Sequence, residues 1–295
     1  MTDPLPDLRS KAATTGGKAA GGPSDCAPVD RGSNQFGAAV SALSHQGDVP
    51  VDPYKESFYP EIRFGGFSDS DGTVTFYNRV NAMTTPDSVV VDFGCGRGRH
   101  ADDPVAFRRG LQCLKGRVAR VIGLDVDLAG QQNPTLDEFR ALRPEEAWPI
   151  EDGSVNLVLC DCVLEHLPKP SLFFSEAHRV LVRGGFLCLR TTNLLGYVGL
   201  AAKLIPKRLH TSVLHKAQGM REEKDIFPTL YRCNTIRSIR REMKAHGFHA
   251  VVYGHNAEPS YFNFSRLAYA AGVLHQKMAP GAFGITIFAF GEVLS

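Results

Sequence analysis

The clearest pattern in the chain is a series of short apolar runs that each close with an aspartate. The segments Val89–Asp92, Val121–Asp125 and Val155–Asp161 are rich in β-branched and other apolar side chains up to that final acid. Short, nearly continuous apolar runs are typical of strands that are covered on both faces of a parallel sheet. The pattern therefore predicts an α/β fold whose buried strands end in acidic residues.

Periodicity and helix end signals predict further elements around these strands. We predict a helix over Val74–Ala82 and a second helix within Val105–Leu114, after a loop at Asp102–Pro104. A third helix begins at about Ser175 and ends in the pair Gly184–Gly185, and a strand over Phe186–Arg190 follows it. We predict a last helix over Thr235–His246, which is capped by Asn234 or Thr235 and ends at Gly247, and two last strands over His249–His255 and Ile285–Phe290.

The N-terminal stretch differs in kind from the rest of the chain. Residues 1–49 are small, polar and without periodicity, as in Gly16–Ser24, and we predict that they are disordered. We expect residues 50–295 to form one domain, in which 194–234 and 256–284 are insertions that bind or cover a substrate.

Composition and charge exclude some classes of protein. The chain has 295 residues, a hydrophobic content of 43% and a formal net charge of +2, which fits an enzyme-sized domain and gives no reason to expect a nucleic-acid partner. The N-terminus lacks the basic start and apolar core of a secretory signal, and no uncharged apolar run reaches the roughly 18 residues of a membrane span. A cytoplasmic location is the resulting expectation.

The cysteines do not indicate a disulfide framework or a metal centre. The chain has seven, an odd number, and they are scattered. Cys160 and Cys162 flank Asp161, and alternation along the strand would place both on one face, yet no second ligand pair accompanies them. We interpret them as buried structural thiols and predict no metal.

The first apolar strand continues into a turn with three alternating glycines, Gly94, Gly96 and Gly98. Glycines at such positions allow a tight turn and let the backbone approach a ligand closely. The spacing is G-x-G-x-G, which departs from the G-x-G-x-x-G fingerprint of dinucleotide-binding turns and argues against a nicotinamide cofactor. A ligand site at the end of this strand is the leading hypothesis.

The acid at the end of the second strand has two interpretations. Asp125 stands where a carboxylate can accept hydrogen bonds from both hydroxyls of a ribose, but an aspartate there can also cap the next helix. Asp92 and Asp125 are 33 residues apart in number (125 − 92), whereas about 20 are usual in such a unit. We attribute the excess to residues near Ala101–Gly116 and favour the ribose role.

Several segments, taken in order, resemble the class I S-adenosylmethionine-dependent methyltransferases, particularly the type 11 group. The matching segments are Asp92–Gly98, Gly123–Asp125, Pro149–Ser154, Leu164–Leu167 and Arg179–Gly185. The resemblance covers roughly residues 85 to 195. It implies a Rossmann-like sheet of seven strands, mostly parallel with an antiparallel last strand, with helices on both faces and S-adenosyl-L-methionine bound across the carboxyl ends of the first strands.

The resemblance also implies roles for individual residues. Asp92 and the turn of Gly94, Cys95, Gly96 and Gly98 would hold the methionine part of the cofactor, Asp125 the ribose hydroxyls and Val126 the adenine face, with Asp161 a further cofactor contact. The acid at the adenine edge normally follows strand three, and we expect that region at Asp137–Leu142.

The methyl acceptor is less defined by the sequence. If the acceptor is a hydroxyl, His166 is the candidate base, because imidazole titrates near neutrality and the residue follows the fourth strand; the alternative is that Glu165 and His166 only orient that loop. Glu165, Asn193 and Tyr231 are candidate acceptor contacts. A basic stretch from Lys203 to Arg221 is either a solvated face or a cationic lid.

Aromatic residues before the first strand, Tyr54, Tyr59, Phe64 and Phe67, could cover the cofactor or simply pack on the sheet. Our prediction is a methyltransferase that acts on oxygen of a small molecule or a saccharide. The alternatives are a nicotinamide-dependent oxidoreductase and a cofactor-binding module without turnover.

Overall fold

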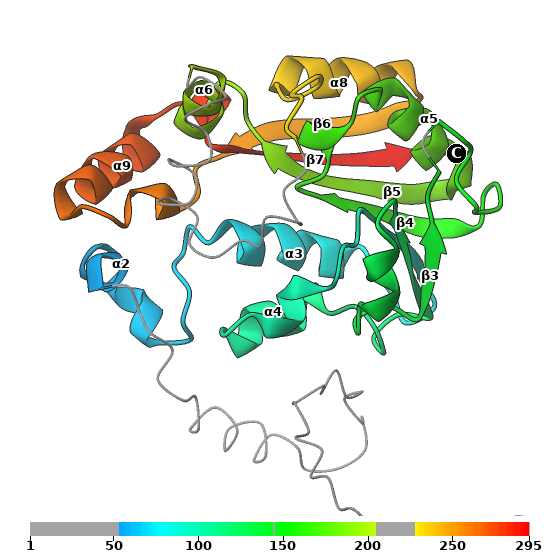
Figure 1. Ribbon diagram of the computed structural model, residues 1–295, viewed down its shortest axis with the longest axis horizontal. Helices are drawn as coiled ribbons and strands as arrows, with labels where there is room; N and C mark the ends of the chain where they lie inside the picture. The colour runs from blue at the N-terminus through cyan, green and yellow to red at the C-terminus, as the bar shows by residue number, and fades with distance from the viewer. Residues whose placement is uncertain (1–52, 144, 205–227, 295) are drawn as a thin grey trace, which may run out of the picture.

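The computed structural model describes residues 53–143, 145–204 and 228–294, and a seven-stranded sheet forms its centre (Figure 1). The strands are β1 (Val89–Phe93), β2 (Arg120–Asp125), β3 (Glu138–Ala141), β4 (Val155–Asp161), β5 (Leu181–Thr192), β6 (Phe248–His255) and β7 (Thr286–Val293). Their order across the sheet is β3-β2-β1-β4-β5-β7-β6. β7 runs antiparallel to both β5 and β6, and the other paired strands are parallel, which confirms the predicted fold class.

Helices cover both faces of the sheet (Figure 1). The α-helices are α2 (Pro53–Phe58), α3 (Gly72–Ala82), α4 (Ala106–Gln112), α5 (Pro170–Val180), α6 (Tyr197–Leu204), α8 (Ile236–Ala245) and α9 (Arg266–Met278). Short 3₁₀ helices are η1 (Pro60–Arg63), η2 (Arg99–Asp102), η3 (Leu128–Gln132), η4 (Leu164–His166), η6 (Ser260–Phe262) and η7 (Gly281–Phe283).

Alternation along each strand divides the core into two layers. Val90 of β1 joins the cluster that includes Phe76 of α3, whereas the next residue, Val91, joins the cluster that includes Phe173 of α5 and Ile239 of α8. The two faces of the sheet are therefore both buried, as the continuous apolar runs predicted.

The predicted signals at the ends of α8 are confirmed, and a side chain also caps α3. Thr235 caps α8 in a capping box with Ser238, and Gly247 follows the helix closely. The side chain of Asp71 accepts hydrogen bonds from the backbone of Thr73 and Val74 at the start of α3. α3 therefore begins slightly before the position expected from its apolar residues.

Both predicted ends of the helix after strand four were wrong. α5 begins at Pro170, five residues before Ser175. It ends at Val180, where Leu181 is already extended, so the pair Gly184–Gly185 lies within β5 and does not end the helix. The pairing of β5 with β4 is irregular in this part of the strand, which explains a glycine pair there.

The segment Asp137–Leu142, which we expected after strand three, contains that strand. Asp137 accepts a hydrogen bond from the backbone N–H of Val121, and Glu138 forms an ion pair with Arg140. Both acids therefore already have partners within the protein, and they lie at or before the start of β3. The residues that follow β3 begin at Leu142.

The helices α2, α6 and α9 lie together at one end of the molecule, beyond the main layers (Figure 1). Tyr59 and Ile62 pack there against Tyr269 and Val273 of α9 in a third, smaller cluster. Tyr59 thus packs inward, whereas the side chain of Phe64 is exposed.

Some predictions fall outside the described residues, namely the disorder of 1–49 and most of the basic stretch up to Arg221. In the described part of the chain, no helix is long and apolar enough to cross a bilayer. In the same part, no three or more His, Cys, Asp or Glu side chains are arranged so that they could hold a metal ion.

Candidate active site

The turn after β1 contains glycines for two different reasons. Gly94 has a φ of 72°, and a Cβ added there would lie 2.4 Å from a methyl carbon of Val163, so only glycine fits between the two segments. Gly96 has a φ of 52°, yet a Cβ there would meet nothing within 4 Å. The backbone of Gly96 therefore borders open space that a ligand can enter.

The long interval between Asp92 and Asp125 does not displace the second strand. Phe93 is the register partner of Leu124, so Asp125 follows directly at the carboxyl edge of the sheet. The additional residues form η2 and the short helix α4.

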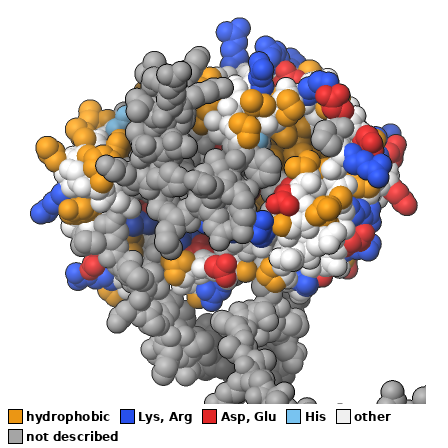
Figure 2. All heavy atoms as spheres, in the orientation of Figure 1, with side chains coloured by type: hydrophobic (Ala, Val, Ile, Leu, Met, Phe, Trp, Pro, Cys, Tyr) orange, Lys and Arg blue, Asp and Glu red, His pale blue; other side chains and the backbone are white. Residues whose placement is uncertain are grey.

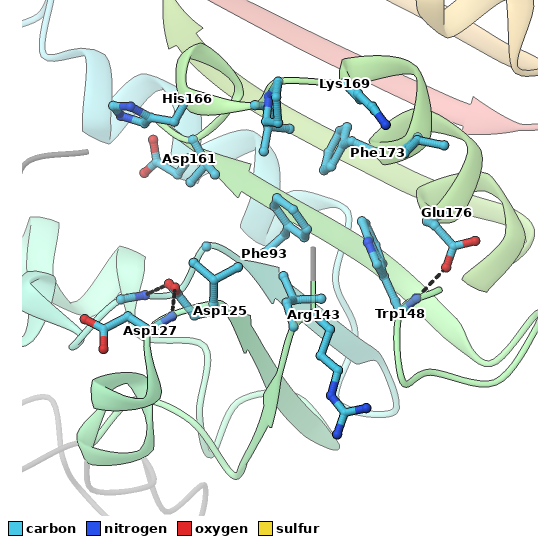
Figure 3. A pocket seen from close by; sticks show the side chains of 18 of the residues that line it. Phe93, Asp125, Asp127, Arg143, Trp148, Asp161, His166, Lys169, Phe173 and Glu176 are labelled. Atoms are coloured by element: carbon cyan, nitrogen blue, oxygen red, sulfur yellow. Dashed lines mark hydrogen bonds between the residues drawn. The ribbon is translucent and has the colours of Figure 1, made fainter. Parts of the chain in front are cut away.

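The buried carboxylate of Asp125 links the turn after β1 to the end of β2 by hydrogen bonds. Its Oδ2 accepts a hydrogen bond of 2.8 Å from the backbone N–H of Gly96, and its Oδ1 accepts one of 2.9 Å from that of Asp127 (Figure 3). A carboxylate oxygen has two lone-pair sites, so each oxygen retains capacity for a further donor. Asp125 can thus hold the turn and still bind two ligand hydroxyls.

A cavity of about 560 Å³ opens at the carboxyl ends of β1, β2 and β4 (Figure 3). Of the residues that the sequence singled out, its walls include Gly94, Gly96, Asp125, Val126, Asp161 and His166. Cavities of this size accommodate small molecules and cofactors. Asp92, Cys95 and Gly98 do not line the cavity.

An aromatic wall completes this cavity and was missed by the sequence reasoning. The ring of Phe93 stacks on Trp148 at a centroid distance of 4.8 Å and meets Phe173 edge-on at 4.9 Å. Glu176 fixes the wall by accepting a 2.6 Å hydrogen bond from the backbone N–H of Trp148 (Figure 3). The lone tryptophan of the chain, three residues before the turn at Glu151, was the available signal.

Three carboxylates cluster at the strand ends. Burial, together with the negative charges of Asp161 and Asp125, raises the pKa of Asp92 to about 7. A cluster of this kind favours a positively charged ligand, because a nearby cation relieves the repulsion among the acids.

Arg190 neutralises one of these acids. Its Nε donates to Oδ1 of Asp161 at 2.5 Å and its Nη2 donates to Oδ2 at 2.6 Å, while the Tyr77 hydroxyl donates to Oδ2 at 2.9 Å. Burial opposes ionisation of Asp161, but the charge and hydrogen bonds of Arg190 outweigh it and lower the pKa. The sequence reasoning missed Arg190, although a charge at the end of an apolar strand was a visible signal.

A second cavity, of about 450 Å³, adjoins the first, and Cys162 lines both. Charged and hydroxyl side chains dominate its walls: Lys55, Asp71, Thr73, Arg108, Arg190, Thr191, Thr192, Glu258, Ser260 and Thr286. Each cation in this wall is paired with an acid, Arg108 with Asp71, Lys55 with Glu258 and Arg190 with Asp161.

The structure corrects the prediction for Cys162. Cys160 is buried, but Cys162 is exposed because β4 ends at Asp161 and the chain turns there with a φ of 57° at Cys162. The simple alternation of a strand does not extend to this residue.

The predicted acceptor contacts Glu165, Asn193 and Tyr231 do not line either cavity. The buried carboxylate of Glu165 accepts hydrogen bonds from the hydroxyls of Thr191 and Thr192. The amide of Asn193 donates to the carbonyls of Ala282 and Gly284.

The remaining two acceptor-side candidates are Tyr231 and His166. The backbone N–H of Tyr231 donates to the carbonyl of Glu165, and Tyr231 lines neither cavity. His166 lines the first cavity, and its Nδ1 lies 3.1 Å from the carbonyl oxygen of Pro228.

Comparison with known proteins identifies a related region in the middle of the chain. Residues 91–189 match the family model of a methyltransferase domain. This segment contains the glycine turn, Asp125 and Asp161.

Curated proteins with similar sequences include two that match part of this chain. A protein named "Probable S-adenosylmethionine-dependent methyltransferase" from Mycolicibacterium smegmatis is 33% identical over 138 residues, which are 44% of this chain and 47% of the relative. A "Ubiquinone biosynthesis O-methyltransferase" from Xanthomonas oryzae is 30% identical over 129 residues, which are 41% of this chain and 53% of the relative. The chain thus spans about half the length of each relative.

Solved structures give a weaker likeness. A methyltransferase from Archaeoglobus fulgidus, described as S-adenosylmethionine-dependent, aligns with a TM-score of 0.46 and 15% identity, covering 79% of this chain and 97% of its own.

Proposed function

We propose, from the premise that residues 91–189 form a class I S-adenosylmethionine-dependent methyltransferase domain, that this chain transfers the methyl group of S-adenosyl-L-methionine to an oxygen of a small polar acceptor. The observation that carries the proposal is the pair of adjoining cavities at the carboxyl edge of the sheet, which share the residue Cys162. One cavity is suited to the cofactor and the other to the acceptor.

The first cavity fits the cofactor on several points. The open space before Gly96 admits a ligand against the backbone, and the free acceptor capacity of Asp125 suits two ribose hydroxyls. The apolar wall of Phe93 and Trp148 suits the adenine ring, and Val126 provides exposed apolar surface beside it. When bound, the cofactor supplies an electrophilic methyl group on a positively charged sulfur.

The acidic residues at the strand ends suit that positive charge. Asp92, Asp125 and Asp161 surround the region where β1, β2 and β4 end, and Arg190 offsets only the charge of Asp161. We propose that Asp92 contributes through its charge, although it does not line the cavity.

The second cavity supports a neutral acceptor that carries several hydroxyl groups, such as a saccharide. Its cations are paired with acids, so an anionic acceptor would have to compete with carboxylates that are already in place. Its threonine and serine hydroxyls both donate and accept hydrogen bonds, which matches the hydroxyl groups of a polyol.

Methyl transfer is an in-line displacement, so the main tasks of the chain are to align the acceptor and to exclude water. His166 lines the first cavity, and it is the proposed base for an acceptor hydroxyl that extends from the second cavity into the first. An oxygen acceptor agrees with the printed name of the Xanthomonas oryzae relative. The cytoplasmic location stays a prediction.

Calorimetric titration tests the proposal directly. The purified chain is titrated with S-adenosylhomocysteine and separately with NADH, and then incubated with S-adenosyl-L-methionine and a panel of neutral polyols, anionic sugars and quinols. Binding of S-adenosylhomocysteine and methylation of a polyol would support the proposal. Binding of NADH alone would overturn the cofactor, and turnover only with anionic or quinol acceptors would overturn the acceptor class.

A further inference from the structure

Helix α9 is apolar on two opposite faces. Its inner face contains the buried residues Tyr269, Gly272 and Val273, which pack against η1 and α2. The opposite face forms what we call the outer stripe, composed of Phe264 just before the helix and of Leu267, Ala271, Leu274 and Met278. These five residues recur at alternating intervals of three and four, so they lie in one line along the helix.

The outer stripe is open to solvent. The exposed fractions are 70% for Phe264, 83% for Leu267, 60% for Leu274 and 73% for Met278. Hydrophobic side chains are visible at the margin of the molecule over α9 (Figure 2). A surface helix normally presents polar residues on its outward face, so a continuous apolar line there indicates a surface that binds something.

The segment that contains the stripe has positive charges and no negative ones. No aspartate or glutamate occurs in the sequence between Glu258 and Glu292, whereas α9 contains the exposed cations Arg266 and Lys277. Those two cations are eleven positions apart, about three helical turns, so they project from the same flank of the stripe.

This arrangement disfavours pairing with a second copy of the chain. An antiparallel pair of α9 helices about a two-fold axis would bring Arg266 of one copy toward Lys277 of the other, without a carboxylate on either helix to offset the repulsion. An anionic surface instead attracts both cations while it buries the stripe.

We propose that the outer stripe of α9 lies on an anionic lipid surface. The apolar side chains would enter the boundary between headgroups and acyl chains, and Arg266 and Lys277 would contact lipid phosphates, as in helices that lie in the plane of a membrane interface. Ser260, which lines the second cavity, lies in η6 shortly before α9. The attachment would therefore hold the segment that contributes Ser260 to that cavity close to the bilayer.

Vesicle sedimentation of the full chain tests this proposal. The protein is mixed with vesicles of phosphatidylcholine alone and with vesicles that also contain phosphatidylglycerol. We expect binding to the anionic vesicles only, weakened by added salt. We expect Leu274→Glu to lower the partition coefficient about tenfold, because it places a charge where an apolar side chain would be buried.

The chain offers a closely matched control. Leu294 is 61% exposed, against 60% for Leu274, and it follows β7 at the opposite end of the molecule from α9 (Figure 1). Leu294→Glu should leave vesicle binding unchanged, and circular dichroism of both variants checks that they are folded.

The proposal would be overturned by the absence of binding to anionic vesicles or by equal losses in the two variants. A dimer in sedimentation velocity that Leu274→Glu dissociates, while vesicle binding stays absent, would overturn it as well. The replacement of both cations, Arg266→Gln with Lys277→Gln, should remove the preference for anionic lipid. A preference that persists in that variant would also contradict the proposal.

Discussion

Arg190 and Asp161 face each other at the ends of neighbouring strands and form a two-point ion pair, with Nε–Oδ1 and Nη2–Oδ2 distances of 2.5 and 2.6 Å. Arg190 also donates to the hydroxyl of Thr73 at 2.8 Å and lies over the rings of Phe76 and Tyr77. The pair therefore joins β4, β5 and α3 where the two cavities meet.

Replacing one member of this ion pair should lower the free energy of unfolding more than replacing both members together would suggest. Arg190→Met leaves the Asp161 carboxylate buried without its partner, and Asp161→Asn leaves the guanidinium in the same position, so we expect each variant to lose about 3 to 5 kcal/mol of unfolding free energy. The double variant should lose less than the sum of the two. Urea unfolding of all four proteins provides the measurement, and additive losses would contradict the coupling.

Asp125→Asn should weaken cofactor binding. The carboxamide keeps one acceptor oxygen but loses the charge and one pair of acceptor sites, and a hydrogen bond to a charged group is worth roughly 1.5 to 3 kcal/mol. We expect the dissociation constant for S-adenosylhomocysteine to rise at least about tenfold. Asp137→Asn is the control, because that carboxylate also binds a backbone N–H but does not line the cavity. Equal effects of the two variants would remove the ribose assignment.

Two glycine variants should distinguish an effect on protein stability from an effect on cofactor binding. Gly96→Ala strains a left-handed backbone by about 1 to 2 kcal/mol, and its methyl group projects into open space beside the cavity, so cofactor affinity should fall in a folded protein. Gly94→Ala adds a clash with Val163 to similar backbone strain and should mainly lower stability. Thermal unfolding and calorimetric titration distinguish the two effects, and unchanged affinity in Gly96→Ala would show that no ligand approaches there.

Asp92 should make stability depend on pH. Its pKa is about 7 in the folded chain and 3.8 in the unfolded reference, so between these values the unfolded state loses a proton that the folded state keeps. The contribution of Asp92 to stability is therefore greatest below pH 3.8 and falls as the pH rises toward 7. Urea midpoints across this window should decline less steeply in Asp92→Asn, and parallel profiles of the two proteins would contradict the assignment.

His166→Ala should lower turnover without changing cofactor affinity if His166 is the base. General base catalysis typically contributes 10²–10⁴-fold, so a loss of at least about a hundredfold in kcat is expected. His249→Ala, in the exposed part of β6, is the control. A kcat that survives in His166→Ala with an established acceptor would reduce His166 to an orienting role.

The cofactor side of the site was more predictable from sequence than the acceptor side. Asp125 and the turn from Gly94 to Gly98 follow strands directly, so their places are set by local chain direction and by the register of neighbouring strands. Trp148 and Phe173 come from a loop and a helix, and only tertiary packing brings them to the same cavity wall.

The acceptor side depends on contacts between residues far apart in the sequence. Lys55 meets Glu258, and Arg108 meets Asp71, across segments that have no common periodicity. Asn193 was attractive from its place after β5, but its amide is taken by backbone carbonyls near Gly284. A position at a strand end predicts a location, and the hydrogen bonds made there decide whether the side chain is free for a ligand.

The position of β7 between β5 and β6 has a consequence for biosynthesis. β6 precedes β7 in the chain, but among the strands that the structure describes it pairs only with β7. Until the ribosome has completed the segment through Val293, β5 has an open edge and the hydrogen-bonding groups of β6 lack a neighbour. The nascent domain is therefore open to aggregation for a large part of its synthesis, and translation that stops before Thr286 would release a chain with an unprotected sheet edge.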